Sequence, residues 1–201
     1  MVAIIKNNRA KIKGLVFLLG LIPLLMLFLG VAQDSLGPDP AKALSHSSGD
    51  WALRFLMLTM AITPLRLITR SSEWVHYRRM LGLFTFFYAV IHLIIYCLFL
   101  LGLQWQDLWG DILERPYITV GFLAWLLMLP MAITSTHRWQ RKLGKRWVRL
   151  HRSIYAASAL VLLHIIWQAR SDLAEPLVYV LIFAILIFVR IPPIKKRLFS
   201  R

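Results

Sequence analysis

Two histidines stand deep inside apolar stretches of the sequence. His92 lies within FFYAVIHLIIY and His164 lies within ALVLLHIIW. An ionisable residue in a segment that crosses a membrane marks a functional position by default. Neutral imidazole is a common metal ligand, and two imidazoles on opposite faces of a flat macrocycle are what a six-coordinate b-type heme requires. His92 and His164 are therefore predicted to be axial heme ligands, and a helix–helix hydrogen bond is the alternative role for each.

Both histidines follow a cluster of arginines at a similar interval. His92 comes 13 residues after Arg79, and His164 comes 12 residues after Arg152. At a rise of about 1.5 Å per residue, each lies roughly 18–20 Å from the inner charged layer. Two helices that run in the same direction would thus carry their imidazoles at one level of the bilayer. Bulky apolar neighbours suit a macrocycle there: Phe86, Phe87, Tyr88, Leu93, Leu163 and Ile165.

A third histidine, His151, precedes His164 by 13 residues. This interval is about 20 Å along one helix, a plausible distance between the centres of two hemes stacked across a membrane. On an ideal helix, however, the two rings point about 140° apart, so two hemes would need a kink or would lie on different flanks. Where an inner partner for His151 would stand on the helix of His92, the sequence has Arg78 and Arg79. The inner site is therefore incomplete.

The remaining histidines and the one cysteine carry less chemistry. His46 is expected in an outer loop, His76 in an inner turn and His137 just after the fourth span, all as surface residues. Cys97 is the single cysteine. This excludes an internal disulfide, a CxxC redox motif and a cysteine-ligated zinc or iron–sulfur site.

The elements that must position these residues are membrane helices. The chain has 201 residues, of which 59% are hydrophobic, against about 45–50% in soluble domains. A bilayer core about 30 Å thick needs about 20 mostly apolar residues per helix. We therefore predict an all-α integral membrane bundle in one domain, 1–201. Its six transmembrane helices are 14–32, 51–68, 80–101, 116–135, 148–168 and 176–191. The connectors 33–50 and 104–115 are expected to be ordinary loops, and no internal repeat stands out.

Charge predicts the orientation of these spans. The two termini and the turns 66–79 and 136–152 hold 20 Lys or Arg and the single acid Glu73, whereas the opposite loops hold three Lys or Arg and eight acids. By the positive-inside rule, both termini are cytoplasmic. The net charge of +15 thus mostly reflects topology. Nucleic-acid binders cluster Lys and Arg on a soluble surface, and so apolar a chain leaves few residues to form one. Four arginines at the inner face are candidates to pair with heme propionates or a flavin phosphate: Arg78, Arg79, Arg149 and Arg152.

Long ordered strings of this sequence resemble one family. They are RRMLGLFTFFYAVIHLIIY, DILERPYITVGFLAW, TSTHRWQRKLGKRWVRLHRSIY and LVLLHIIW. The resemblance is to the heme-binding membrane subunit of the periplasmic protein-methionine-sulfoxide reductase system. That subunit belongs to the ferric-reductase-like transmembrane proteins, which also include the membrane part of NADPH oxidases.

The resemblance implies a multi-pass electron-transfer subunit in the bacterial inner membrane. Electrons would come from a cytoplasmic flavin reductase or from membrane quinone. They would pass through one or two b-type hemes to a periplasmic molybdopterin-containing partner, which reduces methionine sulfoxide in oxidised proteins. The family is also associated with FMN. The histidines that carry over as heme ligands are His92, His151 and His164.

The chain itself shows no nucleophile, general acid, GxGxxG or P-loop motif. Substrate reduction is therefore assigned to the partner, and any NAD(P)H to a separate reductase. Acids of the outer loops form the surface expected to meet the periplasmic partner: Asp34, Asp39, Asp50, Asp107, Asp111 and Glu114.

Two other readings stay open. One is a quinone-linked b-type cytochrome with a different redox partner. The other is a transporter or scaffold without heme, in which the histidines are structural. The predicted midplane holds no Asp or Glu, which disfavours proton or cation coupling.

Overall fold

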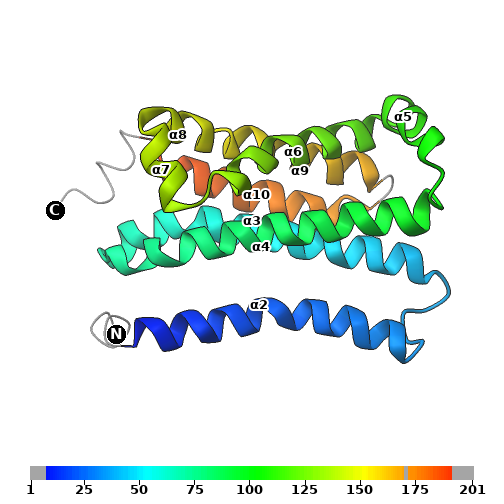
Figure 1. Ribbon diagram of the computed structural model, residues 1–201, viewed down its shortest axis with the longest axis horizontal. Coiled ribbons are helices and arrows are strands. Elements are labelled where there is room, and N and C mark those ends of the chain that lie inside the picture. The colour runs from blue at the N-terminus through cyan, green and yellow to red at the C-terminus, as the bar shows by residue number, and fades with distance from the viewer. Residues whose placement is uncertain (1–7, 170–171, 192–201) are drawn as a thin grey trace. The chain divides into compact units, whose positions relative to one another are not determined.

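A computed structural model describes residues 8–169 and 172–191 of the chain, and within them it contains helices and no strand (Figure 1). Some basic residues counted in the charge argument lie outside the described residues. They are Lys6, Arg170, Lys195, Lys196, Arg197 and Arg201. The chain divides into two compact units. The first holds the residues up to Leu100 and those from Ile185 onward, and the second holds Leu101–Ala184. The predicted all-α class is confirmed for the described residues.

Five helical segments are long and apolar enough to cross a membrane. They are Arg9–Ala32, Pro40–Thr69, Ser72–Leu100, Pro116–Ile133 and Lys145–Gln168. The sixth predicted span corresponds to α10, Ala174–Phe188, which has 15 residues. At about 1.5 Å per residue it is about 22 Å long, shorter than a bilayer core. Six crossings and the sidedness of the termini therefore remain predictions.

Both connectors that the sequence analysis treated as loops contain helix, so that prediction is wrong. Helix α3, Pro40–Thr69, begins well before residue 51. The carboxylate of Asp39 accepts a hydrogen bond from the Lys42 amide at 3.0 Å, and Pro40 occupies the first turn. Both features are strong helix starts. The polarity of residues 40–50 suggested a loop, although the segment is helical and its Ser45 and Ser48 are buried. In the second connector, α5 runs from Trp105 to Glu114 and buries Ile112.

The basic turn after the fourth span is also helical. Helix α7 covers His137–Leu143, and α8 covers Lys145–His151. Gly144 joins them with φ of +50°, a left-handed value that favours glycine. A turn at residues 152–153 then separates α8 from α9, Ile154–Gln168. The predicted continuous helix over 148–168 is therefore interrupted between His151 and His164.

The first unit is built around helix α3 packed on α4, Val75–Ile95, which run side by side (Figure 1). Phe55 stacks between Phe84 and Tyr88, with ring centroids 5.1 and 5.4 Å apart. After Ile95 the chain continues as the π-helical segment η2, Tyr96–Leu100. This aromatic cluster sets the register of α3 against α4, and thereby places His92.

Helix α2, Arg9–Ala32, is joined to this unit through the Tyr88 hydroxyl. That hydroxyl donates to the Gly20 carbonyl at 2.7 Å and accepts from the Leu24 amide at 3.1 Å. It thus inserts into the backbone ladder of α2 next to Pro23, which lacks an amide hydrogen. Two backbone groups that the apolar surroundings could not satisfy gain partners in this way.

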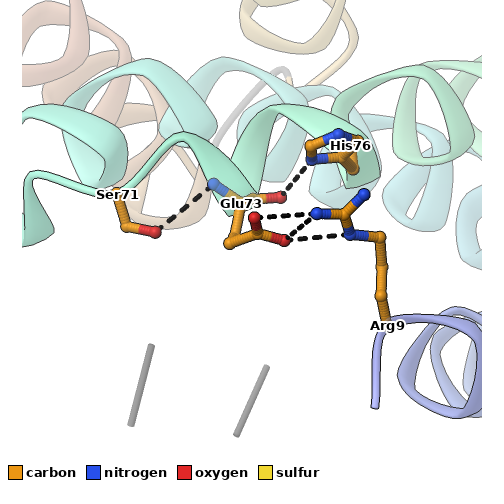
Figure 2. Close-up of polar contacts among 4 residues, drawn as sticks. All are labelled: Arg9, Ser71, Glu73 and His76. Atoms are coloured by element: carbon orange, nitrogen blue, oxygen red, sulfur yellow. Dashed lines mark hydrogen bonds and ion pairs between the residues drawn. The ribbon is translucent and has the colours of Figure 1, made fainter. Parts of the chain in front are cut away.

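A second tie lies at the start of α2 (Figure 2). The Arg9 guanidinium donates from Nε and Nη2 to the two carboxylate oxygens of Glu73, at 2.9 and 2.8 Å. Glu73 belongs to the short helix η1, Ser72–Trp74. Its amide donates to the Ser71 hydroxyl, and its carbonyl accepts from Nδ1 of His76 at 3.2 Å. Glu73, the single acid of the predicted inner side, therefore forms an ion pair that fixes the start of α2.

The second unit pairs α6, Pro116–Ile133, with α9. Small buried residues lie at their contact, with Ala124, Ala157 and Ser158 almost fully inaccessible. Small side chains let membrane helices approach closely. The Thr119 hydroxyl donates to the Ile112 carbonyl, which fastens α5 to the start of α6.

Candidate functional site

His92 stands in the last turn of α4 and is held by the polar beginning of α3. Its Nδ1 lies 2.8 Å from the Ser45 carbonyl oxygen. A carbonyl only accepts, so Nδ1 carries the proton and the lone pair is on Nε2. The Ser48 hydroxyl, 3.4 Å from the same nitrogen, already donates to backbone carbonyls of its own helix. Metal-binding histidines are typically oriented in this manner, with the second ring nitrogen donating to a carbonyl or carboxylate.

The ring of His92 also lies against a glycine. A Cβ atom built on Gly49 would come within 3.2 Å of both Cε1 and Nδ1 of the imidazole. Gly49 follows Ser45 by one helical turn, so both residues present themselves on the same face of α3. The ring of His92 thus packs directly against the backbone of α3.

His164 shows the same arrangement in the second unit. Its Nδ1 lies 2.6 Å from the carbonyl oxygen of Tyr117, in the first turn of α6. A Cβ on Gly121, one turn after Tyr117, would come within 2.8 Å of that nitrogen. His164 is therefore also protonated on Nδ1, with the lone pair on Nε2.

The two histidines thus share one local design, each within its own unit. In both, the histidine lies 47 residues after the residue whose carbonyl it contacts. In both, a glycine one turn after that carbonyl faces the ring. Neither carbonyl partner can be predicted from the sequence, because every residue has a backbone carbonyl whatever its side chain. The equal intervals were the one available signal.

His151 is held differently. Its Nε2 lies 3.4 Å from the hydroxyl oxygen of Thr134, which itself donates to the Pro130 carbonyl at 2.6 Å. The hydrogen between Nε2 and Thr134 therefore comes from the imidazole, the opposite tautomer to that of His92. The indole of Trp147 stacks on the ring with centroids 3.9 Å apart. Ligation through Nε2 would require the contact with Thr134 to break, so His151 remains a predicted ligand.

The other histidines lie on the surface, as predicted, and His137 follows the fourth span as expected, whereas His46 and His76 lie in helices and not in the predicted loop and turn. All three are exposed. His46 lies on α3 rather than in a loop, His76 lies in the first turn of α4, and His137 begins α7. The corrections follow from the helical connectors described above.

Two of the four predicted inner arginines share a cavity. Arg149 and Arg152 line an open hollow of about 270 Å³ together with Lys145 and Val148. Within the part of the chain that the structure describes, none of these three cations forms an ion pair. Sequence reasoning missed Lys145, although its spacing of one turn from Arg149 places both on one helix face. Such a hollow suits an anionic group.

The other two arginines, Arg78 and Arg79, lie exposed near the start of α4 in the first unit. They follow Glu73 by five and six residues and do not take part in its ion pair with Arg9. The structure therefore leaves their predicted role as anion ligands a prediction.

Comparison with known proteins gives a consistent picture. The family model described as "Ferric reductase like transmembrane component" matches residues 48–163. A relative from Xanthomonas oryzae pv. oryzae, named protein-methionine-sulfoxide reductase heme-binding subunit MsrQ, is 49% identical over 155 residues, 77% of this chain and 71% of its own. The protein of the same name from Xanthomonas campestris pv. campestris is 48% identical over 169 residues, 84% of this chain and 76% of its own. No solved structure matches.

Proposed function

Since this chain belongs to the ferric-reductase-like transmembrane family, together with the heme-binding subunits of protein-methionine-sulfoxide reductase, we propose that it is the membrane electron-transfer subunit of such a system. It carries electrons through b-type heme to a reductase that repairs oxidised methionine. Methionine sulfoxide is a reversible step of the oxidation ladder, so its reduction restores the protein that carries it.

The observation that carries this proposal is the shared geometry of His92 and His164. Each ring is fixed by a hydrogen bond from Nδ1 to a backbone carbonyl, at 2.8 and 2.6 Å. This bond leaves Nε2 as the nitrogen with the lone pair, which is the protonation state that iron ligation needs. Each of the two histidines therefore offers a nitrogen that suits heme iron, and we propose that His92 and His164 would hold the heme.

Heme supplies one-electron transfer, and the protein sets its position and environment. Ser45 and Tyr117 hold the two ligand rings through their carbonyls. The hydrogen bond that each Nδ1–H donates to its carbonyl raises the basicity of Nε2, which would strengthen its bond to a metal. The apolar residues beside the two histidines in the sequence would suit a macrocycle: Phe86, Phe87, Leu93, Leu163 and Ile165.

A second, inner heme would use His151, with its other ligand unassigned. Arg149 and Arg152 in the basic hollow would bind an anion, either a heme propionate or the phosphate of FMN. Arg78 and Arg79 on α4 are further candidates for that role. FMN rests on the family resemblance, and the hollow supports it only through its charge.

The route of electrons follows the predicted topology. The cytoplasmic face, which holds both termini, meets the donor, a flavin reductase or membrane quinone. The chain lies in the bacterial inner membrane, and its acidic outer segments meet a periplasmic molybdopterin-containing reductase. The excess of Lys and Arg on one side supports this orientation.

The proposal is tested by the reduced-minus-oxidised visible spectrum of the purified protein, with heme quantified per chain. We expect sharp b-type bands that disappear in His92→Ala and in His164→Ala. His46→Ala and His137→Ala, which change exposed histidines, are the matched controls and should keep full heme content. Partial loss in His151→Ala would identify the inner heme. A colourless wild-type protein from a host supplied with heme would overturn the proposal and favour a transporter or scaffold.

A further inference from the structure

In each unit, a glycine lies against the imidazole ring of the proposed heme ligand. Gly49 on α3 faces His92, and Gly121 on α6 faces His164. A Cβ atom at Gly121 would lie 2.8 Å from Nδ1 of His164, a separation that real Cβ atoms essentially never show. The corresponding separation at Gly49 is 3.2 Å, tight but within reach of a small adjustment.

The obstacle in each case is the imidazole and not the neighbouring backbone. At both glycines the three nearest atoms all belong to the histidine ring. The ring cannot simply retreat, since its Nδ1 is held by the carbonyl one turn earlier on the same helix. A methyl group at Gly121 would therefore push the ring of His164 off its carbonyl and turn Nε2 away from its present direction. A methyl group at Gly49 would displace the ring of His92 only by a few tenths of an ångström.

We infer that Gly49 and Gly121 are positioning residues for the two imidazoles, which require a bare backbone to take up the orientation that binds heme. This inference rests on the proposed function, because it concerns the ligands of that heme. It assigns the glycines a role through the histidines and none in contact with the iron.

The competing explanation is that both glycines serve ordinary helix packing. Gly82 on α4 provides the matched control, since its Cβ would meet only Thr59 Cγ2, at an ordinary 3.6 Å. Alanine forms helix better than glycine, so loss of heme in an alanine variant cannot come from helix propensity.

The experiment measures heme per chain and the electron paramagnetic resonance spectrum of the oxidised protein. We expect Gly121→Ala to lower heme affinity by about 10-fold to 100-fold, the usual cost of disturbing a group that orients a metal ligand. Gly49→Ala should keep heme but shift its low-spin signal, because the clash is smaller. Gly82→Ala should match wild type. Unchanged heme content and spectrum in Gly121→Ala would overturn the inference.

A double-mutant cycle separates positioning from packing and also covers a variant that fails to fold. In a His164→Ala background the ring is gone, so adding Gly121→Ala should not lower the thermal unfolding temperature. Equal destabilisation by Gly121→Ala in both backgrounds would show a packing role and overturn the inference. The pair Gly49→Ala and His92→Ala repeats the cycle in the first unit.

Failure of this inference is distinct from failure of the proposed function. If His92→Ala and His164→Ala keep heme, the ligand assignment itself is wrong. If those variants lose heme while both glycine variants behave as wild type, the ligands stand and only the positioning role falls.

Discussion

Three histidines of this chain fall into two protonation patterns. His92 and His164 donate from Nδ1 to carbonyls, whereas His151 donates from Nε2 to the Thr134 hydroxyl. The nitrogen that presents its lone pair is thus reversed in His151. A ligand role for His151 requires a rearrangement that the other two histidines do not need, and this makes Thr134 the residue to change.

Thr134→Val removes the acceptor of His151 while keeping the size of the side chain. We expect a loss of about 1 kcal/mol in the free energy of unfolding, the net worth of an ordinary hydrogen bond. The spectrum of the heme that we propose for His92 and His164 should not change. Thermal unfolding in detergent and the visible spectrum measure the two effects. A gain of heme per chain would instead show that the Thr134 contact competes with ligation by His151.

At the scale of elements, the polar first third of α3 is the part that orients His92. Ser45, Ser48 and Gly49 all lie in the segment that hydropathy assigned to a loop. Its helical state depends on the cap that Asp39 supplies at its start. The stability of the start of α3 is in this way coupled to the orientation of His92, the proposed heme ligand.

Asp39→Ala should therefore weaken heme binding without touching the histidine. Loss of an N-cap costs about 1 kcal/mol, and the fraying that follows releases the Ser45 carbonyl. Hydrogen exchange of residues 40–48 should rise, and heme per chain should fall. Asp39→Asn keeps a capping side chain and should behave as wild type. Equal heme content in the Ala and Asn variants would contradict the coupling.

Helix α2 offers a second test at this scale. Tyr88→Phe removes the hydroxyl that bridges Gly20 and Leu24, and we expect a loss of about 1–2 kcal/mol in unfolding free energy. Gly20→Ala should also destabilise, because its Cβ would come within 2.5 Å of the Phe84 ring. Gly14→Ala, on the same helix with nothing within 4 Å, is the control for thermal unfolding. Destabilisation by Gly14→Ala equal to that by Gly20→Ala would show that the Phe84 contact is not the cause.

What the sequence predicts correctly here depends on residue type. A helix-length apolar run is visible in the sequence, and it located five spans. A histidine among apolar residues is visible too, and the ligand roles of His92 and His164 stay predictions. Ser45, Gly49, Tyr117 and Gly121 act through backbone or through the lack of a side chain, so nothing in their type announces the role. The interruption between α8 and α9 was invisible too, since no proline or glycine marks it.

At the scale of the whole molecule, the number of crossings decides where the C-terminus lies. The positive-inside rule places both termini in the cytoplasm, which requires the short helix α10 to cross. Reporter fusions test this: a fluorescent protein that folds only inside and a phosphatase active only outside. We expect inside signals at both ends and an outside signal at Gly37, which lies in the turn after α2. An outside signal at the C-terminus would leave five crossings.

The hollow lined by Lys145, Arg149 and Arg152 has a kinetic consequence. Its positive charge, unbalanced by any ion pair among the described residues, attracts a negatively charged electron donor from a distance. The association rate of a reduced flavin nucleotide should therefore fall steeply as ionic strength rises, because salt screens such steering beyond about 10 Å at 0.1 M. A neutral quinol that arrives through the lipid would be indifferent to salt. The slope of the reduction rate against ionic strength thus tells which donor feeds the protein.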